Sequence, residues 1–315
     1  MDFPIQDLLN QEACSQFLLD LVHPAGLRCP RCQATAGFST PRYFRAPVLD
    51  SRCPRCNRVF NAWTGTPFQG THGRPSQIVL ILRGFAPGTS TAPLARELAW
   101  SRRHLLDLRH RLPAQARAGS DRTPWEDSVV EADELDQNAG EKGVPHEDPE
   151  DPPRRRANQV RGHGTLDNDR PPVLGVVGRE SGQVRLDVVE HADPESLETL
   201  VVDQTQPGTR VNPDAWSGSN HRPARGRGRA AVCHTPGERA WARDDDGDGV
   251  REVQNTTLEG LWTGLRNFLR QFRGVNKWFL NQYVARFEWA HKIKEATPDF
   301  LRTLLGIRVL TNFGP

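Results

Sequence analysis

Four of the six cysteines in this 315-residue chain occur as two Cys-Pro-Arg-Cys pairs. The first pair is Cys29 and Cys32, and the second pair, 20 residues further along, is Cys53 and Cys56. Two such pairs can surround one Zn²⁺ tetrahedrally, and a site made only of thiolates is closed and structural rather than catalytic. Two disulfides are the alternative, but no secretory signal is recognisable at the start of the chain, which favours zinc. The pattern predicts a zinc ribbon over residues 25–72.

A second group of residues suited to chemistry consists of acids in the second half of the chain. Asp133 lies in DSVVEADELDQ, which alternates like a strand and would place Glu131 on the same face as Asp133. Asp214 ends a short predicted strand, and Glu259 lies on a predicted helix. Three converging carboxylates can hold two Mg²⁺ ions, because Mg²⁺ prefers oxygen ligands. Spacing alone does not single these three out of 39 Asp and Glu residues.

The order of the predicted elements gives a reason to group these acids. Over residues 126–295 the pattern predicts a strand, a long loop at 138–170, two strands, a helix, two strands and a helix. This is the order of an RNase H-like α/β domain. In such a domain, acids on the first strand, after the fourth strand and on a late helix meet at one end of the sheet. Asp133, Asp214 and Glu259 occupy those three places.

The stretch 253–278 carries the third acid on a strongly amphipathic helical pattern. Its apolar stripe contains Leu258, Leu261, Leu265, Phe268, Leu269 and Phe272. A neighbouring stripe contains Glu259, Thr263, Arg266, Arg270 and Arg273. For a generic helix, such a stripe is a solvated face with helix-stabilising ion pairs. The alternative is a metal-binding acid beside a row of arginines that contact phosphates.

The front of the chain is basic and contains a pair of predicted helices. Residues 1–120 hold 15 Arg and no Lys against 7 Asp and Glu, which gives +8, whereas the remainder carries −6. Within residues 73–118, TAPLAREL and SRRHLLDLRHRL predict two helices joined by a tight turn. An ordinary helical hairpin would look the same, but the surplus charge favours a DNA-binding helix-turn-helix. The candidate contact residues are Arg102, Arg103, His104 and Arg109.

The ends of the chain add little chemistry. Residues 1–24 predict a short amphipathic helix, and residues 296–315 predict a last short helix or tail. The sequence has no run of 18 apolar residues, so we expect no membrane span and a cytoplasmic location.

Several long segments carry a family resemblance that covers nearly the whole chain. They are CPRC…CPRC, FNAWTGTPFQGT, VVEADELDQNAGEKG, DPPRRRANQVRGHGT, ARDDDGDGVREV and NTTLEGLWTGLRNFLRQFRGVNK. In these segments the chain resembles the zinc-ribbon-bearing DDE transposases of bacterial insertion sequences, the group with the ISXO-type transposase domain.

The resemblance implies a function, a set of partners and a catalytic triad. It implies Mg²⁺- or Mn²⁺-dependent cleavage and strand transfer at terminal inverted repeats, with a homo-oligomer assembled on double-stranded element ends and target DNA in the nucleoid. It also implies that Asp133, Asp214 and Glu259 are the first, second and third acids of the triad.

The chain departs from that family's pattern near two of the acids. Pro213 precedes Asp214 where relatives tend to have Thr, and Ser219 stands where they tend to have Tyr. Gln254, just before the third acid's helix, replaces a His. A catalytically weakened or inactive, transposase-derived DNA-binding protein is therefore an alternative. A general RNase H-like nuclease is a third, although a helix-turn-helix would then have little purpose.

Overall fold

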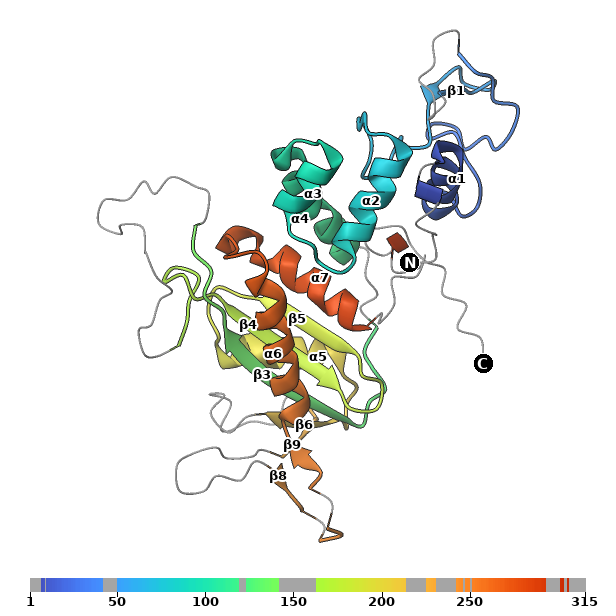
Figure 1. Cartoon of the computed structure of the whole chain (residues 1–315). Coiled ribbons are helices and arrows are strands. Elements are labelled where there is room, and N and C mark those ends of the chain that lie inside the picture. Colours follow the sequence, from blue (N-terminus) through green and yellow to red (C-terminus); the bar gives the residue numbers. More distant parts are fainter. Residues whose placement is uncertain are drawn as a thin grey trace. The chain divides into compact units, whose positions relative to one another are not determined.

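The computed structural model describes the greater part of the chain. The described residues are 7–8, 10–41, 50–118, 123–141, 163–213, 225–230, 242–245, 247–249, 251–292, 301–302 and 305. They form two compact units (Figure 1). One unit comprises Met1–Ser120 with Ile293–Pro315, and the other comprises Asp121–Lys292.

The first unit contains four helices and a small two-stranded sheet within its described residues. The helices are α1 (Gln11–Val22), α2 (Pro75–Phe85), α3 (Thr91–Leu98) and α4 (Arg102–Ala118). β1 (Ser51–Arg52) pairs antiparallel with β2 (Val59–Phe60). The Asn10 side chain caps α1 by accepting from the N–H groups of Glu12 and Ala13, which is why this helix begins at Gln11.

The second unit is built on a five-stranded mixed sheet, which confirms the α/β class predicted from the sequence. Its strands are β3 (Val129–Asp136), β4 (Pro172–Gly178), β5 (Val184–Val188), β6 (Arg210–Pro213) and β7 (Gly228–Arg229). They lie in the order β5-β4-β3-β6-β7. β4 is antiparallel to both β3 and β5, whereas β6 is parallel to both β3 and β7. The first and fourth strands of this unit are therefore neighbours.

Helices cover both faces of the sheet (Figure 1). α5 (Pro194–Gln204) packs on one face, and α6 (Thr256–Arg270) and α7 (Leu280–Lys292) pack on the other. Every residue of β4 is buried, because this strand is covered on both sides. A short hairpin, β8 (Ala242–Arg243) with β9 (Val253–Gln254), leads into α6. None of the described helices combines the length and the apolar character needed to cross a membrane.

The amphipathic stretch 253–278 is a shorter helix than its pattern predicted. Val253 and Gln254 form a strand, the helix ends at Arg270, and η2 (Lys277–Phe279) is a 3₁₀ turn. Arg273 and Gly274 both have positive φ, 53° and 99°, so the backbone leaves the helical conformation there. The predicted continuation of the helix to Trp278 was therefore wrong.

The close packing of α6 on β4 depends on a glycine. A Cβ added to Gly175 would lie 2.5 Å from the Trp262 ring, so only glycine lets this helix approach the strand. Gly260, on the exposed side of the same helix, has no atom within 4 Å of such a Cβ.

We expect opposite effects from alanine at these two glycines. Gly175→Ala should lower the free energy of unfolding by about 1–3 kcal/mol through overpacking against Trp262. Gly260→Ala should raise it by up to about 1 kcal/mol, because alanine favours a helix over glycine. Urea unfolding followed by circular dichroism measures both, and a Gly175→Ala protein as stable as the wild type would contradict the packing described here.

Candidate functional site

The four predicted cysteine ligands come together in the first unit. The Sγ atoms of Cys29, Cys32, Cys53 and Cys56 all lie within 4.8 Å of one another. The shortest Sγ–Sγ distances, Cys29–Cys56 and Cys32–Cys53, are 3.5 Å, and none of the four is in a disulfide. A tetrahedral zinc with Zn–S distances of about 2.3 Å separates its sulfurs by about 3.8 Å. The cluster thus fits a zinc ribbon and can hold one zinc ion.

The two cysteine pairs adopt the same local turn. Gln33 and Asn57, each directly after the second cysteine of its pair, have φ of 58° and 60°. The N–H of Gln33 donates to the Cys29 carbonyl at 2.9 Å, and that of Asn57 donates to the Cys53 carbonyl at 3.0 Å. This repetition turns the Sγ atoms of both pairs toward a common centre.

Thiols this close together titrate against one another. Burial opposes the ionisation of Cys29, but hydrogen bonds from the backbone N–H groups of Cys32 and Arg31 lower its pKa to about 6. For Cys56, a backbone hydrogen bond at Arg58 favours the thiolate, whereas burial and the neighbouring sulfurs raise its pKa to about 12. The cluster thus stabilises one thiolate readily, and a divalent cation is needed to stabilise all four.

The acids predicted on the first strand lie on the face of β3 that α6 covers. Glu131 is fully buried and Asp133 is half-buried, and both come from this one face, as their alternate positions predicted. The indole N–H of Trp262 donates to Asp133 Oδ2 at 2.9 Å. Trp262 lies three residues after Glu259 on α6, so the helical turn that carries Glu259 is tied to the strand that carries Asp133.

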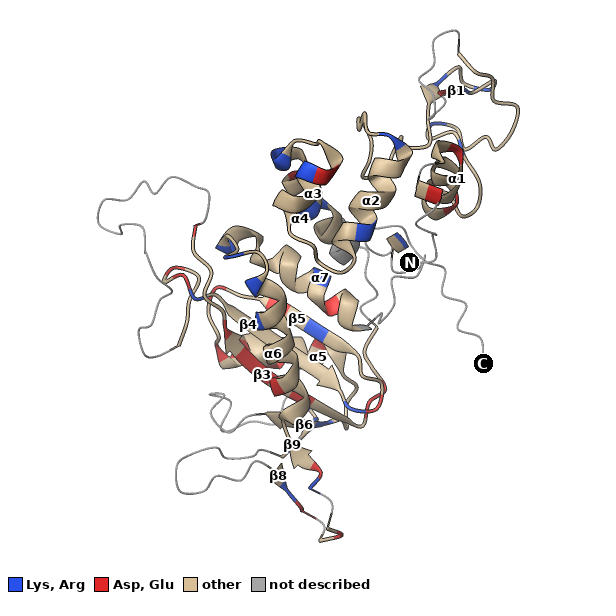
Figure 2. Ribbon diagram, in the orientation of Figure 1, with Lys and Arg blue, Asp and Glu red and all other residues tan. Residues whose placement is uncertain are grey.

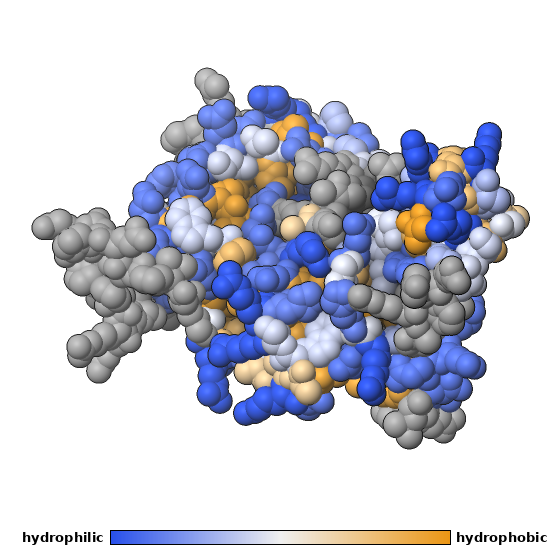
Figure 3. Space-filling model, turned by 90° about the horizontal axis from the view of Figure 1, so that it is seen from above, coloured by the Kyte–Doolittle hydropathy of each residue, from blue (hydrophilic) through white to orange (hydrophobic). Residues whose placement is uncertain are grey.

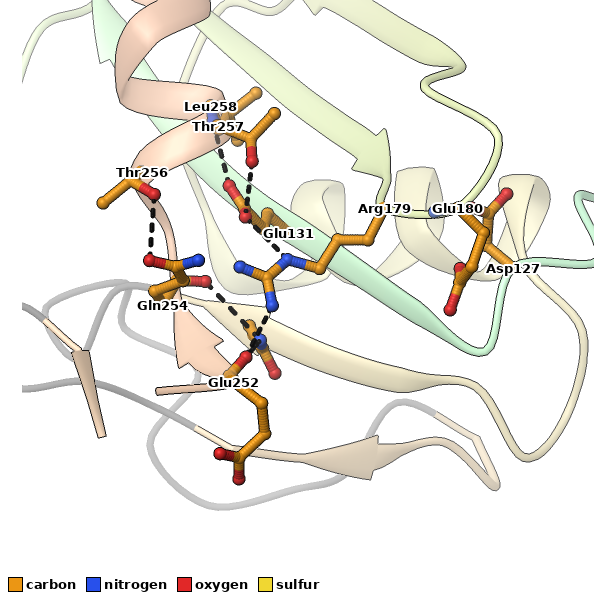
Figure 4. Close-up of polar contacts among 10 residues, drawn as sticks. Asp127, Glu131, Arg179, Glu180, Glu252, Gln254, Thr256, Thr257 and Leu258 are labelled. Atoms are coloured by element: carbon orange, nitrogen blue, oxygen red, sulfur yellow. Dashed lines mark hydrogen bonds and ion pairs between the residues drawn. The ribbon is translucent and has the colours of Figure 1, made fainter. Parts of the chain in front are cut away.

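The buried carboxylate of Glu131 fastens the start of α6 (Figure 4). The backbone N–H of Leu258 donates to Oε2 at 2.9 Å, and the hydroxyl of Thr257 donates to Oε1 at 2.9 Å. Arg179 completes the group with an ion pair at 3.0 Å from its Nε to the same Oε1. A carboxylate at a helix N-terminus is stabilised by the unpaired N–H groups and the helix dipole. Glu131 therefore acts as the cap that the side chain of Asn255, the residue before α6, does not provide.

Arg179 and Asn212 extend this attachment to the strand before α6. Arg179 Nη1 donates to the carbonyl of Glu252 at 2.5 Å. Asn212, which lies opposite Glu131 on β6, donates to the carbonyls of Glu252 and Gln254 at 3.4 and 3.5 Å. The chain entering α6 is thus bound to β3, to β6 and to the end of β4.

The remaining predicted acids differ in how far the structure describes them. Glu259 lies in the first turn of α6 and is half-buried. Asp214 lies outside the described residues. β6 ends at Pro213, which pairs with Ala132 in the parallel register of β6 and β3.

Two of the three arginines predicted on this helix lie on its exposed side. Arg266 and Arg270 are exposed on α6. In Figure 2, basic residues lie on this helix and acidic residues lie on β3. Arg273 is also exposed but lies beyond the end of the helix, in the turn where the backbone has positive φ.

The basic residues of the first unit divide into exposed and buried ones. Arg102, Arg103 and His104 are exposed in the first turn of α4, where the Ser101 hydroxyl accepts from the N–H of His104 at 3.4 Å. The connection from α3 to α4 is short, because Ala99 adopts the left-handed conformation at the end of α3.

Arg109 is not a surface residue, which corrects its predicted role. It is 5% exposed, its Nε donates to Thr91 Oγ1 at 3.0 Å, and its guanidinium lies 4.4 Å from the centre of the Phe85 ring. Its partner Thr91 is the first residue of α3. Arg109 holds α4 to α2 and α3.

The residues that sequence reasoning missed are the polar groups that attach α6 to the sheet. An acid such as Glu131, in a strand whose neighbours are apolar, signals a buried partner. Nothing in the sequence indicates that the partners are Arg179, Asn212 and the backbone of Leu258, because these lie 48 to 127 residues away from Glu131.

No family model matches this chain. The chain is similar to a protein of Halobacterium salinarum described as an uncharacterized protein in transposable element ISH50. The two are 26% identical, over 96% of this chain and 99% of the relative.

For the cysteine cluster we predict one bound zinc per chain. Cys29→Ser should abolish stoichiometric zinc and unfold the ribbon, since a structural metal contributes directly to folding. Cys14→Ala is the matched control, because Cys14 is buried in α1 outside the cluster. Metal content by mass spectrometry measures both, and full zinc occupancy in Cys29→Ser would contradict the assigned site.

For Glu131 we predict a structural effect that Glu259 does not share. Glu131→Ala removes the acceptor of Arg179 Nε and of the Leu258 N–H, so it should lower the free energy of unfolding by about 2–4 kcal/mol. Glu259→Ala, in the first turn of α6, should change it by no more than about 0.5 kcal/mol. Urea unfolding combined with hydrogen exchange over α6 distinguishes the two, and equal effects would contradict the capping role of Glu131.

Proposed function

We propose that this protein is an insertion-sequence transposase. It binds the terminal inverted repeats of its element and catalyses Mg²⁺- or Mn²⁺-dependent cleavage and strand transfer. The observation that carries the proposal is the attachment of the Glu259 turn of α6 to the acidic face of β3, through Glu131 at Leu258 and through Asp133 at Trp262. Similarity along its whole length to a protein of a transposable element supports a transposase-related role.

The sheet topology supports an RNase H-like catalytic domain. The first strand, β3, and the fourth strand, β6, lie side by side and parallel in this unit. Asp133 follows Ala132, which is the β3 partner of Pro213, and Asp214 is the residue that follows Pro213 at the end of β6. This order of strands is the one in which the acids of such a domain converge with an acid from a late helix.

The proposed triad is Asp133, Asp214 and Glu259. Their oxygen donors suit Mg²⁺, and a bound pair of such ions supplies activation of water or a 3′-hydroxyl and stabilisation of the leaving oxygen. The chain's own contribution is positioning. The Trp262 indole fixes the orientation of the Asp133 carboxylate, and Glu131 fixes the helical turn that presents Glu259.

The basic surfaces would hold the DNA. In the first unit, the exposed residues Arg102, Arg103 and His104 at the start of α4 have the position of base-reading residues in a helix-turn-helix. In the second unit, Arg266 and Arg270 extend from Glu259 along α6 and would contact phosphates near the cleaved bond. Two element ends would be bound by a homo-oligomer.

A second candidate function is DNA binding without cleavage. The observation that favours it is Gln254, the last residue of β9, which stands where the family that the chain resembles tends to have His. Its side-chain oxygen accepts from Thr256 Oγ1 at 3.1 Å, so it contributes to the start of the helix. In this case the protein would recognise element ends that it does not cut.

For the leading proposal we predict loss of cleavage when either described triad acid is neutralised. Asp133→Asn and Glu259→Gln should each reduce Mg²⁺-dependent nicking of inverted-repeat DNA by about 10²- to 10³-fold or more, because the charge that holds the metal is lost. Glu195→Gln is the matched control, since Glu195 is exposed on α5 over the opposite face of the sheet. Nicking is read on end-labelled duplexes.

The same assay separates the candidate functions. Activity that persists in Asp133→Asn or Glu259→Gln rejects the assigned mechanism. End-specific binding without nicking in Mg²⁺ or Mn²⁺, with nicking gained by Gln254→His, supports the second candidate. Cleavage without preference for element ends indicates a general nuclease instead.

A further inference from the structure

Two adjacent aromatic side chains are exposed at the turn between α6 and α7. Among the described residues, the exposed large hydrophobic side chains are Val59, Trp278 and Phe279. Trp278 is 56% exposed and Phe279 is 38% exposed. The surface is otherwise mostly hydrophilic, with hydrophobic residues in small separate patches, in the view of Figure 3. Exposure of this extent is uncommon for tryptophan, which is buried to a large degree on average.

The turn that carries these rings is firmly held. The Asn276 side chain accepts from the N–H of Trp278 at 3.0 Å, and the N–H of Phe279 donates to the carbonyl of Asn276 at 3.0 Å. The N–H of Lys277 donates to the carbonyl of Gly140 at 2.9 Å. The rings thus belong to a 3₁₀ turn that is hydrogen-bonded both within itself, at Asn276, and to the backbone of Gly140.

Lys277 provides the strongest of these attachments. It is 8% exposed, and its Nζ lies 3.4 Å from Glu141 Oε1 and 3.2 Å from Asp169 Oδ1. The same ammonium lies 5.3 Å from the centre of the Trp278 ring. Burying a lysine is costly unless its charge is paired. Here the partners come from the two ends of the long segment 138–170, so both ends support the aromatic turn.

Within the sequence stretch that carries these rings the charges are all positive, and the acids that contact it, Glu141 and Asp169, are paired with the buried Lys277. Residues 266–279 contain four basic residues and no Asp or Glu. Three of the four, Arg266, Arg270 and Arg273, are exposed, whereas Lys277 is buried. Exposed rings that follow a run of exposed arginines in the chain offer both kinds of contact that unpaired nucleotides use, since bases stack on rings and phosphates contact cations.

We propose that Trp278 is a stacking platform for an unpaired DNA base, and that Arg270 and Arg273 bind the phosphates of the same strand. The occupant is nucleic acid because the charge of the stretch is complementary to phosphate, and because two rings are too small an apolar area for a stable protein interface. The inference rests on DNA being the partner in the proposed function. It deepens that function by assigning recognition of unpaired nucleotides, which strand cleavage and joining expose, to the turn between α6 and α7.

The test compares paired and unpaired DNA without divalent metal, so that no cleavage occurs. Fluorescence anisotropy measures the affinity of the full-length zinc-bound protein for a duplex with one unpaired central base, for a single strand and for the fully paired duplex. Trp278→Ala should weaken binding to the first two by about 5- to 100-fold, the range for one base–aromatic stack, and binding to the paired duplex by less than about twofold. Trp278→Phe should recover most of the lost affinity.

Two further variants separate stacking from charge and from exposure alone. Arg273→Ala should weaken binding to all three DNAs and reduce the salt dependence by about one phosphate contact. Val59→Ala, at an exposed apolar residue of the other unit, should leave the preference for unpaired DNA unchanged.

Several results would overturn the stacking role. They are an unchanged affinity in Trp278→Ala, an equal loss on paired DNA, or a change of oligomeric state in that variant on sedimentation, which would indicate a protein contact. Because these measurements need no catalysis, a protein that fails to nick DNA can still support stacking. Conversely, if the protein cleaves DNA but its Trp278→Ala variant binds unpaired DNA with unchanged affinity, the stacking role is rejected and the proposed function is not.

Discussion

The second unit depends on one buried carboxylate at the start of a helix. Glu131 lies in the middle of β3, fully buried, where an acid is costly unless its charge is matched. Its oxygens accept from Leu258, Thr257 and Arg179, so the helix N-terminus and a guanidinium together match that charge. The same hydrogen bonds set the residue at which α6 begins and the face that the helix turns toward the sheet. The positions of Glu259 and Trp262 follow from that orientation, since both lie within the next two turns.

Two acids two residues apart on β3 thus have different surroundings. Glu131 has its oxygens occupied by the protein and is out of contact with solvent, which suits a structural role. Asp133 is half-buried, nearer the end of the strand, and receives the Trp262 indole on one oxygen. The two acids therefore differ in burial and in the groups that contact their oxygens. Gly175, opposite Asp133 on β4, leaves the space in which the indole can reach it.

The first unit shows the same division between residues that hold the fold and residues that remain at the surface. Arg109 contacts Phe85 and Thr91 inside the unit, and the four cysteines contact one another. Arg102, Arg103 and His104 are left exposed at the start of α4. Charge alone does not separate these groups, because all of the arginines look equally basic in the sequence. Their positions on α4 separate them, because Arg109 faces α2 and α3.

The sequence by itself determined the features that depend on local pattern and residue chemistry. The CPRC pairs specified a four-thiolate cluster, and apolar periodicity specified β3, β4, β5, α5 and most of α6. The end of α6 at Arg270 could not be read from the sequence, because the apolar stripe continues to Phe272 and the chain turns only at Arg273 and Gly274. Only the tertiary structure decided that Arg109 is internal, that Glu131 caps α6, and that Lys277 joins both ends of the segment 138–170. The reason is physical: each of these roles depends on partners distant in sequence, and a side chain's burial is set by the elements that pack on it.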